Sequence, residues 1–276
     1  MARILLPPGR RPKKRLGQNF LVRPSLLRAI AERAGLTEET TVVEIGAGTG
    51  NLTRELARRA GKVYALEFDR DLAAALREEF AAGNVEVVQA DALTFDFSAL
   101  KPARGGLKIV GNLPYNISVP VIFRLLETPG PADELLLMVQ KEVADRITAS
   151  PGGKHYGILS VLCQMLADAK VVLRVPPSAF SPRPKVESAV IRFRLLEEPR
   201  YPVADWEFFK RVVKAAFGQR RKIVANALRG SEDLALPAGA VAQALRQAGI
   251  EPDRRAQTLT LAEFAELARV MVKLKT

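Results

Sequence analysis

The run Gly-Asn-Leu-Pro-Tyr-Asn at residues 111–116 carries the side chains best suited to chemistry on a planar nitrogen base. Asn112 offers a neutral side-chain carbonyl, and the backbone of Leu113 offers a second acceptor. Pro114 fixes its own φ and disfavours a helical conformation at the residue before it, so both acceptors can be directed at one point. Tyr115 adds a flat ring for stacking, which is worth roughly 1–3 kcal/mol per base.

Such a pair of acceptors indicates activation of an exocyclic amine. The N6 atom of adenine is a poor nucleophile because its lone pair is shared with the ring. Two acceptors that hold its hydrogens favour a tetrahedral nitrogen, whose lone pair is then free to attack. A plainer interpretation is a strand followed by an Asn-x-Pro turn with a packing tyrosine, and the run alone does not decide between the two.

A second candidate site is the glycine-rich turn at residues 44–53, where an apolar strand gives way to a helical pattern. Gly46 and Gly48 let a ligand approach the backbone, and the N-terminus of the following helix offers unpaired N–H groups. The spacing is Gly-x-Gly-x-Gly, which differs from the Gly-x-Gly-x-x-Gly pattern of dinucleotide binders. A plain tight turn would have the same appearance.

Three polar residues follow at the ends of the next predicted strands. Glu67 ends the second strand, where a carboxylate can hold both hydroxyls of a ribose. Asp91 ends the third strand, close to the expected position of an adenine amine, and Asn112 ends the fourth. Ligands of open α/β sheets bind outside the carboxyl ends of the strands, so we expect these residues to meet in one crevice. Each acid could instead cap a helix or form a surface salt bridge.

These residues favour a nucleoside cofactor without phosphates. The glycine turn contains no Lys or Arg that could bind a pyrophosphate. S-adenosylmethionine fits this pattern, and its sulfonium makes the methyl group electrophilic without help from a metal. Transfer then depends on alignment of the amine, the methyl group and the sulfur, an effect worth up to about 7–11 kcal/mol.

The elements that must position these residues alternate between short apolar runs and longer helical patterns. This alternation predicts βαβ units and hence an α/β fold with a doubly wound sheet. Together with the methyl donor inferred above, we expect a Rossmann-like methyltransferase sheet. Two later runs could add an antiparallel pair at the sheet edge. The expected strands are 41–45, 62–66, 85–89, 107–110 and 135–139, then 171–174 and 189–195, and the expected helices are 24–34, 52–60, 71–82 and 119–126.

The formal charge of +12 is concentrated in two segments. Residues 1–23 contain seven Lys or Arg and no acid, and residues 205–229 contain seven against two acids, which together account for the whole excess. A basic run is usually a solvated face, but this concentration indicates a phosphate backbone as partner. We expect Arg220, Arg221 and Lys222 to open a helix and contact RNA phosphate; a solvated helix start is the alternative.

The sequence pattern changes after Glu-Glu-Pro at residues 197–199, which indicates a domain boundary. From residue 205 onward the pattern is helical throughout, which predicts a small all-helical C-terminal domain. We therefore expect three parts. They are a flexible basic arm at residues 1–14, a methyltransferase domain at residues 15–198 and a helical RNA-binding domain at residues 199–276, with helices at 208–217, 222–228, 240–248 and 261–273.

The composition also argues against several classes of protein. A single histidine, His155, and a single cysteine, Cys163, cannot build a metal site, so no metal is expected. One cysteine excludes an internal disulfide framework, which fits a cytoplasmic protein. No segment reaches the roughly 18 apolar residues of a membrane span, and the N-terminus lacks the apolar region of a secretory signal.

In combination, these motifs resemble the small-subunit (16S) ribosomal RNA adenine N6,N6-dimethyltransferases, the KsgA type. The resemblance extends from residue 15 to about residue 267 and is specific in its combination of motifs. Ala47 and Glu187 depart from the common pattern without touching the proposed chemistry. The matching motifs lie at residues 15–21, 44–53, 112–116, 140–144, 156–161, 180–186 and 217–222, with an asparagine at 226.

The resemblance implies a role for each matching residue. Asn112 would lie between the cofactor and the target base, while Tyr115 and Phe180 would sandwich a flipped adenine. From the residues alone, Phe180 could equally anchor a buried loop. The catalytic set would be Asn112, Leu113, Pro114, Tyr115 and Phe180. The residues that bind S-adenosylmethionine would be Asn19, Leu21, Gly46, Gly48, Glu67, Asp91 and Asn112.

The implied substrate is a pair of adjacent adenosines near the 3′ end of small-subunit rRNA, each methylated twice. The partner would be an immature 30S-type particle during ribosome biogenesis, and the protein would act as a monomer. Two other readings stay open. One is an N6-adenine methyltransferase for another nucleic acid, and the other is a non-catalytic ribosome-assembly factor. The presence of Glu67, Asp91 and Asn112 argues against the latter.

Because the amine becomes acidic once it is methylated, transfer needs no histidine base. Replacing His155 with Ala should therefore leave turnover within a few-fold of the wild type. Steady-state methyl transfer to RNA measures this directly. A loss of about a thousandfold would overturn this mechanism, since general-base catalysis contributes about 10²–10⁴-fold.

Overall fold

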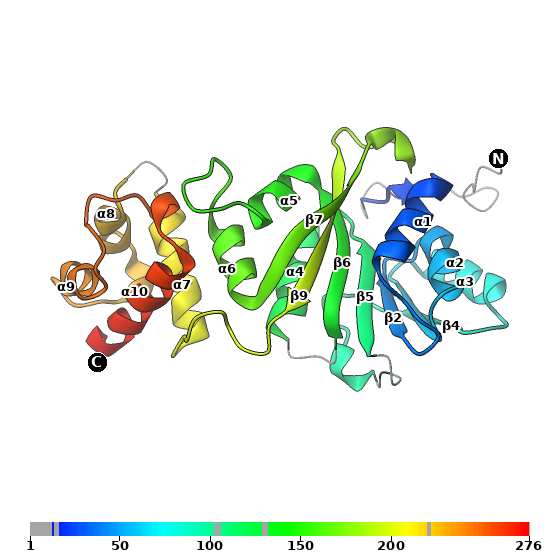
Figure 1. Ribbon diagram of the computed structural model, residues 1–276, viewed down its shortest axis with the longest axis horizontal. Coiled ribbons are helices and arrows are strands. Elements are labelled where there is room, and N and C mark those ends of the chain that lie inside the picture. Colours follow the sequence, from blue (N-terminus) through cyan, green and yellow to red (C-terminus); the bar gives the residue numbers. More distant parts are fainter. Residues whose placement is uncertain are drawn as a thin grey trace. The chain divides into compact units, whose positions relative to one another are not determined.

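The computed structural model describes residues 13, 17–100, 102, 106–128, 132–219 and 222–275. The chain divides into two compact units, each formed from two segments (Figure 1). The first unit comprises Met1–Ala144 and Asp168–Leu195, and the second comprises Asp145–Ala167 and Leu196–Thr276. Apart from Lys13, the basic arm expected at residues 1–14 lies outside the described residues.

A seven-stranded sheet with the order β4-β3-β2-β5-β6-β9-β7 forms the first unit. The pairs among β2 to β6 are parallel, and β9 runs antiparallel to β6. The prediction of a doubly wound α/β sheet is thereby confirmed. The strands are β2 (Thr41–Ile45), β3 (Lys62–Glu67), β4 (Val85–Gln89), β5 (Leu107–Asn112), β6 (Ala132–Gln140), β7 (Ala167–Val175) and β9 (Ser188–Leu195).

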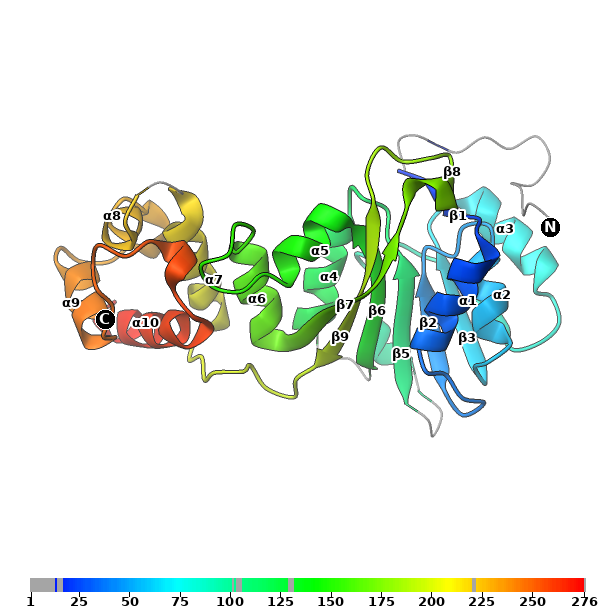
Figure 2. The ribbon, with the colours of Figure 1, turned by 45° about the horizontal axis from the view of Figure 1, so that its top comes forward.

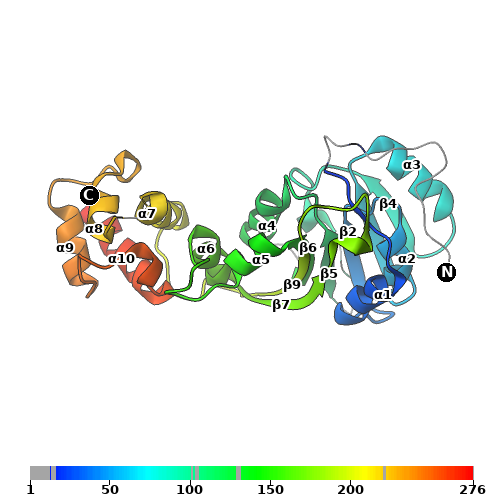
Figure 3. The ribbon, with the colours of Figure 1, turned by 90° about the horizontal axis from the view of Figure 1, so that it is seen from above.

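Helices cover both faces of this sheet, and Figure 3 shows α1 and α4 on opposite sides. Strand β2 is buried at every position, as expected for a central strand with both faces covered. Helix α1 starts with Pro24, whose fixed φ suits the first turn. The helices of this unit are α1 (Pro24–Arg33), α2 (Asn51–Ala57), α3 (Arg70–Glu79) and α4 (Ser118–Glu127); α5 (Lys141–Ile147) begins in this unit and ends in the second.

Two very short strands escape sequence analysis. β1 (Phe20–Leu21) pairs antiparallel with β8 (Phe180–Ser181), as Figure 2 shows. Strands of two residues carry no hydrophobic period, so only the tertiary pairing reveals them. The pairing joins the N-terminal segment to the loop that precedes β9. Leu21 and Phe180 then pack into one apolar cluster with α1 and α2.

The second unit is built from helices, in agreement with the predicted C-terminal pattern. Phe208, Phe209 and Phe264 are fully buried in it. The segment 145–167 joins this unit through hydrogen bonds from Gly152 N to the Gln257 carbonyl (2.7 Å) and from the Tyr156 hydroxyl to the Leu259 carbonyl (2.9 Å). Its helices are α6 (Ile158–Leu166), α7 (Trp206–Gly218), α8 (Val224–Arg229), α9 (Ala240–Gln247) and α10 (Leu261–Leu274).

In the part of the chain that the structure describes, no helix is both long and apolar enough to cross a membrane. Helix α8 begins at Val224, two residues after Lys222, so Lys222 precedes this helix and does not open it.

Candidate active site

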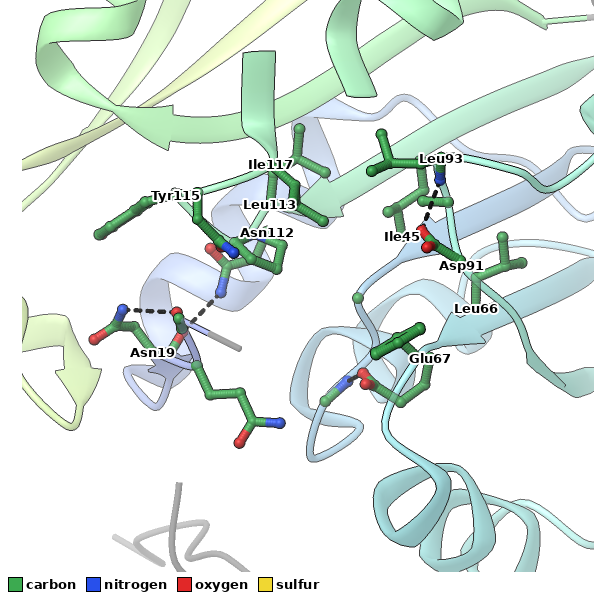
Figure 4. Close-up of a pocket in the computed structure, with 18 of the residues that line it drawn as sticks. Asn19, Ile45, Leu66, Glu67, Asp91, Leu93, Asn112, Leu113, Tyr115 and Ile117 are labelled. Carbon is green, nitrogen blue, oxygen red and sulfur yellow. Dashed lines mark hydrogen bonds between the residues drawn. The ribbon is translucent and has the colours of Figure 1, made fainter. Parts of the chain in front are cut away.

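A cavity of about 230 Å³ lies at the carboxyl edge of the sheet in the first unit (Figure 4). The ends of β2, β3, β4 and β5 converge on it, as the strand-end rule predicts. The N-terminal segment 17–20 forms a further wall. The cavity brings together most of the expected site residues: Asn19, Gly46, Gly48, Glu67, Asp91, Asn112, Leu113, Pro114 and Tyr115.

The glycine turn that follows β2 lies close to two other segments of the chain. Gly46 and Gly48 both have positive φ, 75° and 58°, in the region that favours glycine. A Cβ at Gly48 would lie 3.0 Å from the ring of Phe20, and one at Gly46 would lie 3.4 Å from the Asn112 carbonyl oxygen. The turn thus packs against both the N-terminal segment and the end of β5, so it is more than a plain connection.

Glu67 is held rigidly at the end of β3, with only 7% of its surface exposed. Its Oε2 accepts a hydrogen bond from Gly48 N and its Oε1 accepts one from Asp69 N, both at 2.8 Å. Burial raises the pKa of Glu67, and these backbone hydrogen bonds oppose the rise. A carboxylate has about four acceptor positions, so each oxygen keeps room for one further donor. Two vicinal hydroxyls suit that arrangement.

Asp91 and Phe68 complete this side of the cavity. The Oδ1 of Asp91 accepts from Leu93 N at 2.9 Å, which leaves Oδ2 to bind an amine. Phe68 lines the cavity although its surface is 58% exposed. An exposed ring beside a ribose-binding acid can pack on the face of a heterocycle. Phe68 was not identified as a site residue from the sequence. Its position directly after Glu67 was the signal that could have identified it.

Asn112 is oriented by a single hydrogen bond, which Figure 4 shows. Its Nδ2 donates to the Asn19 carbonyl at 2.9 Å, so its Oδ1 is left as an acceptor at the cavity. The next residue is fixed as well, because Leu113 N donates to the Met138 carbonyl at 3.1 Å. At Gly111 a Cβ would lie 2.9 Å from the Ile45 carbonyl oxygen, so the strand end packs tightly against β2.

Tyr115 is anchored at its far end. Its hydroxyl shares a hydrogen bond of 2.8 Å with Ser188 Oγ, at the buried start of β9. Burial raises the pKa of Tyr115, against the opposing effect of this hydrogen bond, so the phenol stays neutral at physiological pH. The ring is half-buried at the cavity and held in one plane, as a stacking platform requires. Ser188 was also missed, because it lies 73 residues away in the sequence.

Leu21 and Phe180 lie elsewhere. They face each other across the β1–β8 pair and are only 4% and 5% exposed. Neither is among the described residues that line the cavity. In this structure Phe180 anchors its loop, which is one of the two interpretations that the sequence allowed for this residue. Its place in a sandwich around a flipped base stays a prediction, as does closure of Leu21 over the cofactor.

The expected phosphate-binding residues belong to the second unit. Lys222 is exposed, and Arg220 and Arg221 lie outside the described residues. His155 is also exposed and belongs to that unit, and it is not among the described residues that line the cavity.

The strand order, with β9 antiparallel beside β6, and the cavity at the carboxyl edge define a Rossmann-like methyltransferase. The family model described as "Ribosomal RNA adenine dimethylase" matches residues 9–273, and the chain belongs to this family.

Relatives of known sequence and structure agree with this membership. Proteins named "Ribosomal RNA small subunit methyltransferase A" from Syntrophotalea carbinolica and Moorella thermoacetica are each 47% identical to this chain. The first match covers 95% of this chain and 97% of the relative, and the second covers 94% and 92%. A dimethyladenosine transferase from Plasmodium falciparum has a TM-score of 0.77 at 25% identity, covering 89% of this chain and 94% of that one. The 23S rRNA methyltransferase ErmE has a TM-score of 0.68 at 31% identity, covering 92% and 99%.

A buried acid lies directly beneath the glycine turn. Glu44 on β2 is 2% exposed and accepts a hydrogen bond from the Thr53 hydroxyl on α2. Burial raises the pKa of Glu44 to about 8, and the negative charge of Glu67 acts in the same direction. Glu44 is therefore protonated at neutral pH and adds no charge of its own beside Glu67.

Replacing Glu44 with Gln should make stability less dependent on pH. An unfolded Glu44 ionises near pH 4.5, while the folded carboxyl stays protonated up to about pH 8. The wild type therefore loses stability as pH rises through this window, and Gln does not. Thermal unfolding between pH 5 and pH 8 should show the Tm difference growing in favour of Glu44→Gln. A difference that stays constant with pH would contradict the assignment.

Proposed function

We propose that this protein uses S-adenosylmethionine to dimethylate the N6 amines of two adjacent adenosines near the 3′ end of small-subunit rRNA. The observation that carries the proposal is the oriented amide of Asn112, which presents a neutral acceptor beside the Tyr115 ring. Family membership and the small-subunit names of the 47% identical relatives support the choice of substrate. We further propose that the protein acts as a monomer in the cytoplasm, on an immature 30S-type particle during ribosome biogenesis.

The cavity fits a nucleoside with an uncharged or cationic tail. Glu67 has free acceptor positions for two ribose hydroxyls, Asp91 has one for an adenine amine, and Phe68 offers a ring face. None of the described residues that line the cavity is Lys or Arg, so nothing in this wall matches a phosphate. When bound, S-adenosylmethionine supplies a methyl carbon that its sulfonium makes electrophilic. Asn19 and the rest of segment 17–20 would flank its methionine part.

The chain's own residues prepare the target amine. The Asn112 Oδ1 and the Leu113 carbonyl accept its hydrogens and favour a nitrogen with a free lone pair, without placing a charge in the cavity. Tyr115 fixes the plane of the base. Extrusion of an adenosine from its stack costs a few kcal/mol, which ring stacking offsets. The proton that the amine loses after methylation can pass to water, so these residues need only orient the amine and the base.

The second unit would bind the RNA backbone. Lys222 is exposed next to the two arginines that precede it in sequence, and this basic segment carries much of the excess charge. Phosphate contacts position a nucleic acid without reading its sequence. Selection of the two adenosines would then depend on the shape of the rRNA and on the cavity.

Replacing Asn112 with Ala should reduce methyl transfer by about a hundredfold or more, the range found when one preorganised polar group is removed from an active site. Binding of unmethylated small subunits should change less than twofold, because the extruded base is the only part of the RNA that Asn112 would contact. Incorporation of labelled methyl groups, with mapping of the modified nucleosides, measures transfer and identifies the target. His155→Ala is the matched control and should behave as the wild type. An equal loss of binding and transfer would make Asn112 a structural residue.

Binding of small-subunit rRNA should depend steeply on salt, and Lys222→Ala should reduce the slope of log K against log salt by about 0.7–0.9. Each neutralised phosphate releases counterions, so loss of one contact removes one increment of slope. Lys170→Ala, an exposed lysine on the edge strand β7, is the control and should keep the wild-type slope. An equal slope for Lys222→Ala and the wild type would remove Lys222 from the phosphate contacts.

A further inference from the structure

Asp69 is a buried carboxylate beside the cavity that the mechanism does not use. Its side chain is only 2% exposed. Three donors converge on it: Lys13 Nζ at 2.9 Å, Gln18 Nε2 at 3.2 Å and Asp71 N at 3.0 Å. Hydrogen bonds to a charged acceptor are about twice as strong as neutral ones. This residue therefore ties α3 to the N-terminal segment.

The same residue also contacts the ribose-binding acid. The backbone N of Asp69 donates to Glu67 Oε1 at 2.8 Å. Its side chain contacts Gln18, which lines the cavity together with its neighbours in segment 17–20. Asp69 thus links opposite sides of one cavity, the acid at the end of β3 and the wall from the N-terminus.

Helix capping explains only part of this arrangement. Asp69 is the N-cap of α3, and that role needs only the hydrogen bond from Asp71 N. The other two donors come from residues 51 and 56 positions earlier in the chain. Lys13 is held further, because its backbone N donates to Gln18 Oε1 at 2.8 Å. Lys13, Gln18 and Asp69 therefore each contact the other two, at the outer end of the wall.

We propose that Asp69 is a positioning residue for the cofactor: through Gln18 and Lys13 it holds the wall of residues 17–20 against the cavity before the nucleoside binds. This inference rests on the proposed function, since the ligand is the cofactor of that site. A wall that is ordered in advance does not have to be ordered at the moment of binding, and affinity rises accordingly. The inner end of the wall is held separately by the hydrogen bond between Asn112 and the Asn19 carbonyl.

Replacing Asp69 with Asn separates positioning from capping. Asn is as good an N-cap as Asp, so α3 should keep its start. The variant loses the ion pair with Lys13, and an amide cannot match a carboxylate in accepting from all three donors. Calorimetry with S-adenosylhomocysteine should show affinity about tenfold weaker than that of the wild type, with faster hydrogen exchange at amides 17–21.

Two controls make this result specific. Asp205→Asn alters the N-cap of α7 in the second unit, where the side chain accepts from Phe208 N at 2.9 Å, and should change neither readout. Lys13→Met removes the ion pairs of Lys13 with Asp69 and Asp71 but leaves the capping hydrogen bond from Asp71 N to Asp69 in place. It serves as the test should Asp69→Asn fail to fold. Lys13 is 38% exposed and does not belong to the described residues that line the cavity, so its loss should weaken binding several-fold only through the wall.

The outcomes separate this inference from the function on which it rests. If the wild type does not bind S-adenosylhomocysteine at all, the proposed function itself is contradicted. A wild type that binds, with a folded Asp69→Asn variant of equal affinity and equal exchange, would overturn the positioning role alone. Equal weakening by Asp69→Asn and Asp205→Asn would trace the effect to a general loss of stability and would contradict a specific role of Asp69 at the wall. Wild-type affinity in Lys13→Met would also contradict the proposal.

Discussion

The site depends on one hydrogen bond, from the Asn112 amide nitrogen to the Asn19 carbonyl. This 2.9 Å contact decides which end of a nearly symmetric amide faces the cavity. With the nitrogen engaged, the oxygen is the group offered to a ligand, and an acceptor is what an aromatic amine needs. The same bond joins the end of β5 to a segment 93 residues earlier. This one contact therefore both orients the amide and holds the N-terminal segment at the cavity.

The rest of the structure supports that contact by close packing at the carboxyl edge of the sheet. The glycine turn after β2 lies close to both neighbouring segments: a Cβ at Gly48 would be 3.0 Å from the Phe20 ring, and one at Gly46 would be 3.4 Å from the Asn112 carbonyl oxygen. Glu67 reinforces the turn by accepting from Gly48 N. Beneath it, burial keeps Glu44 protonated, so this carboxyl adds no negative charge next to Glu67.

Features with a local signal could be predicted from the sequence. The strands at 41–45 and 85–89 have the bounds expected, because short valine-rich runs between turn residues mark them. The polar residues at the ends of β3, β4 and β5 also meet as predicted, since a parallel sheet brings its strand ends to one edge. The resemblance to a family added the N-terminal segment, which no periodicity would have placed at the cavity.

What could not be predicted are contacts between residues far apart in the chain. The Tyr115–Ser188 bond, the β1–β8 pair and the cluster around Asp69 leave no periodic trace, because each needs only one or two residues from either side. For the same reason, the sequence did not show that residues 145–167 belong to the second unit. Phe180 illustrates the limit: a phenylalanine in a proline-rich loop has the same sequence whether it meets a ligand or, as here, is buried.

A structure of the protein bound to S-adenosylhomocysteine and an RNA fragment with an unpaired adenosine tests the orientation of Asn112 most directly. The adenine N6 should lie about 2.7–3.2 Å from Asn112 Oδ1, with Nδ2 still donating to the Asn19 carbonyl. An adenine bound with the amide reversed, so that Nδ2 faces the base, would contradict the account, as would an adenine bound away from Tyr115.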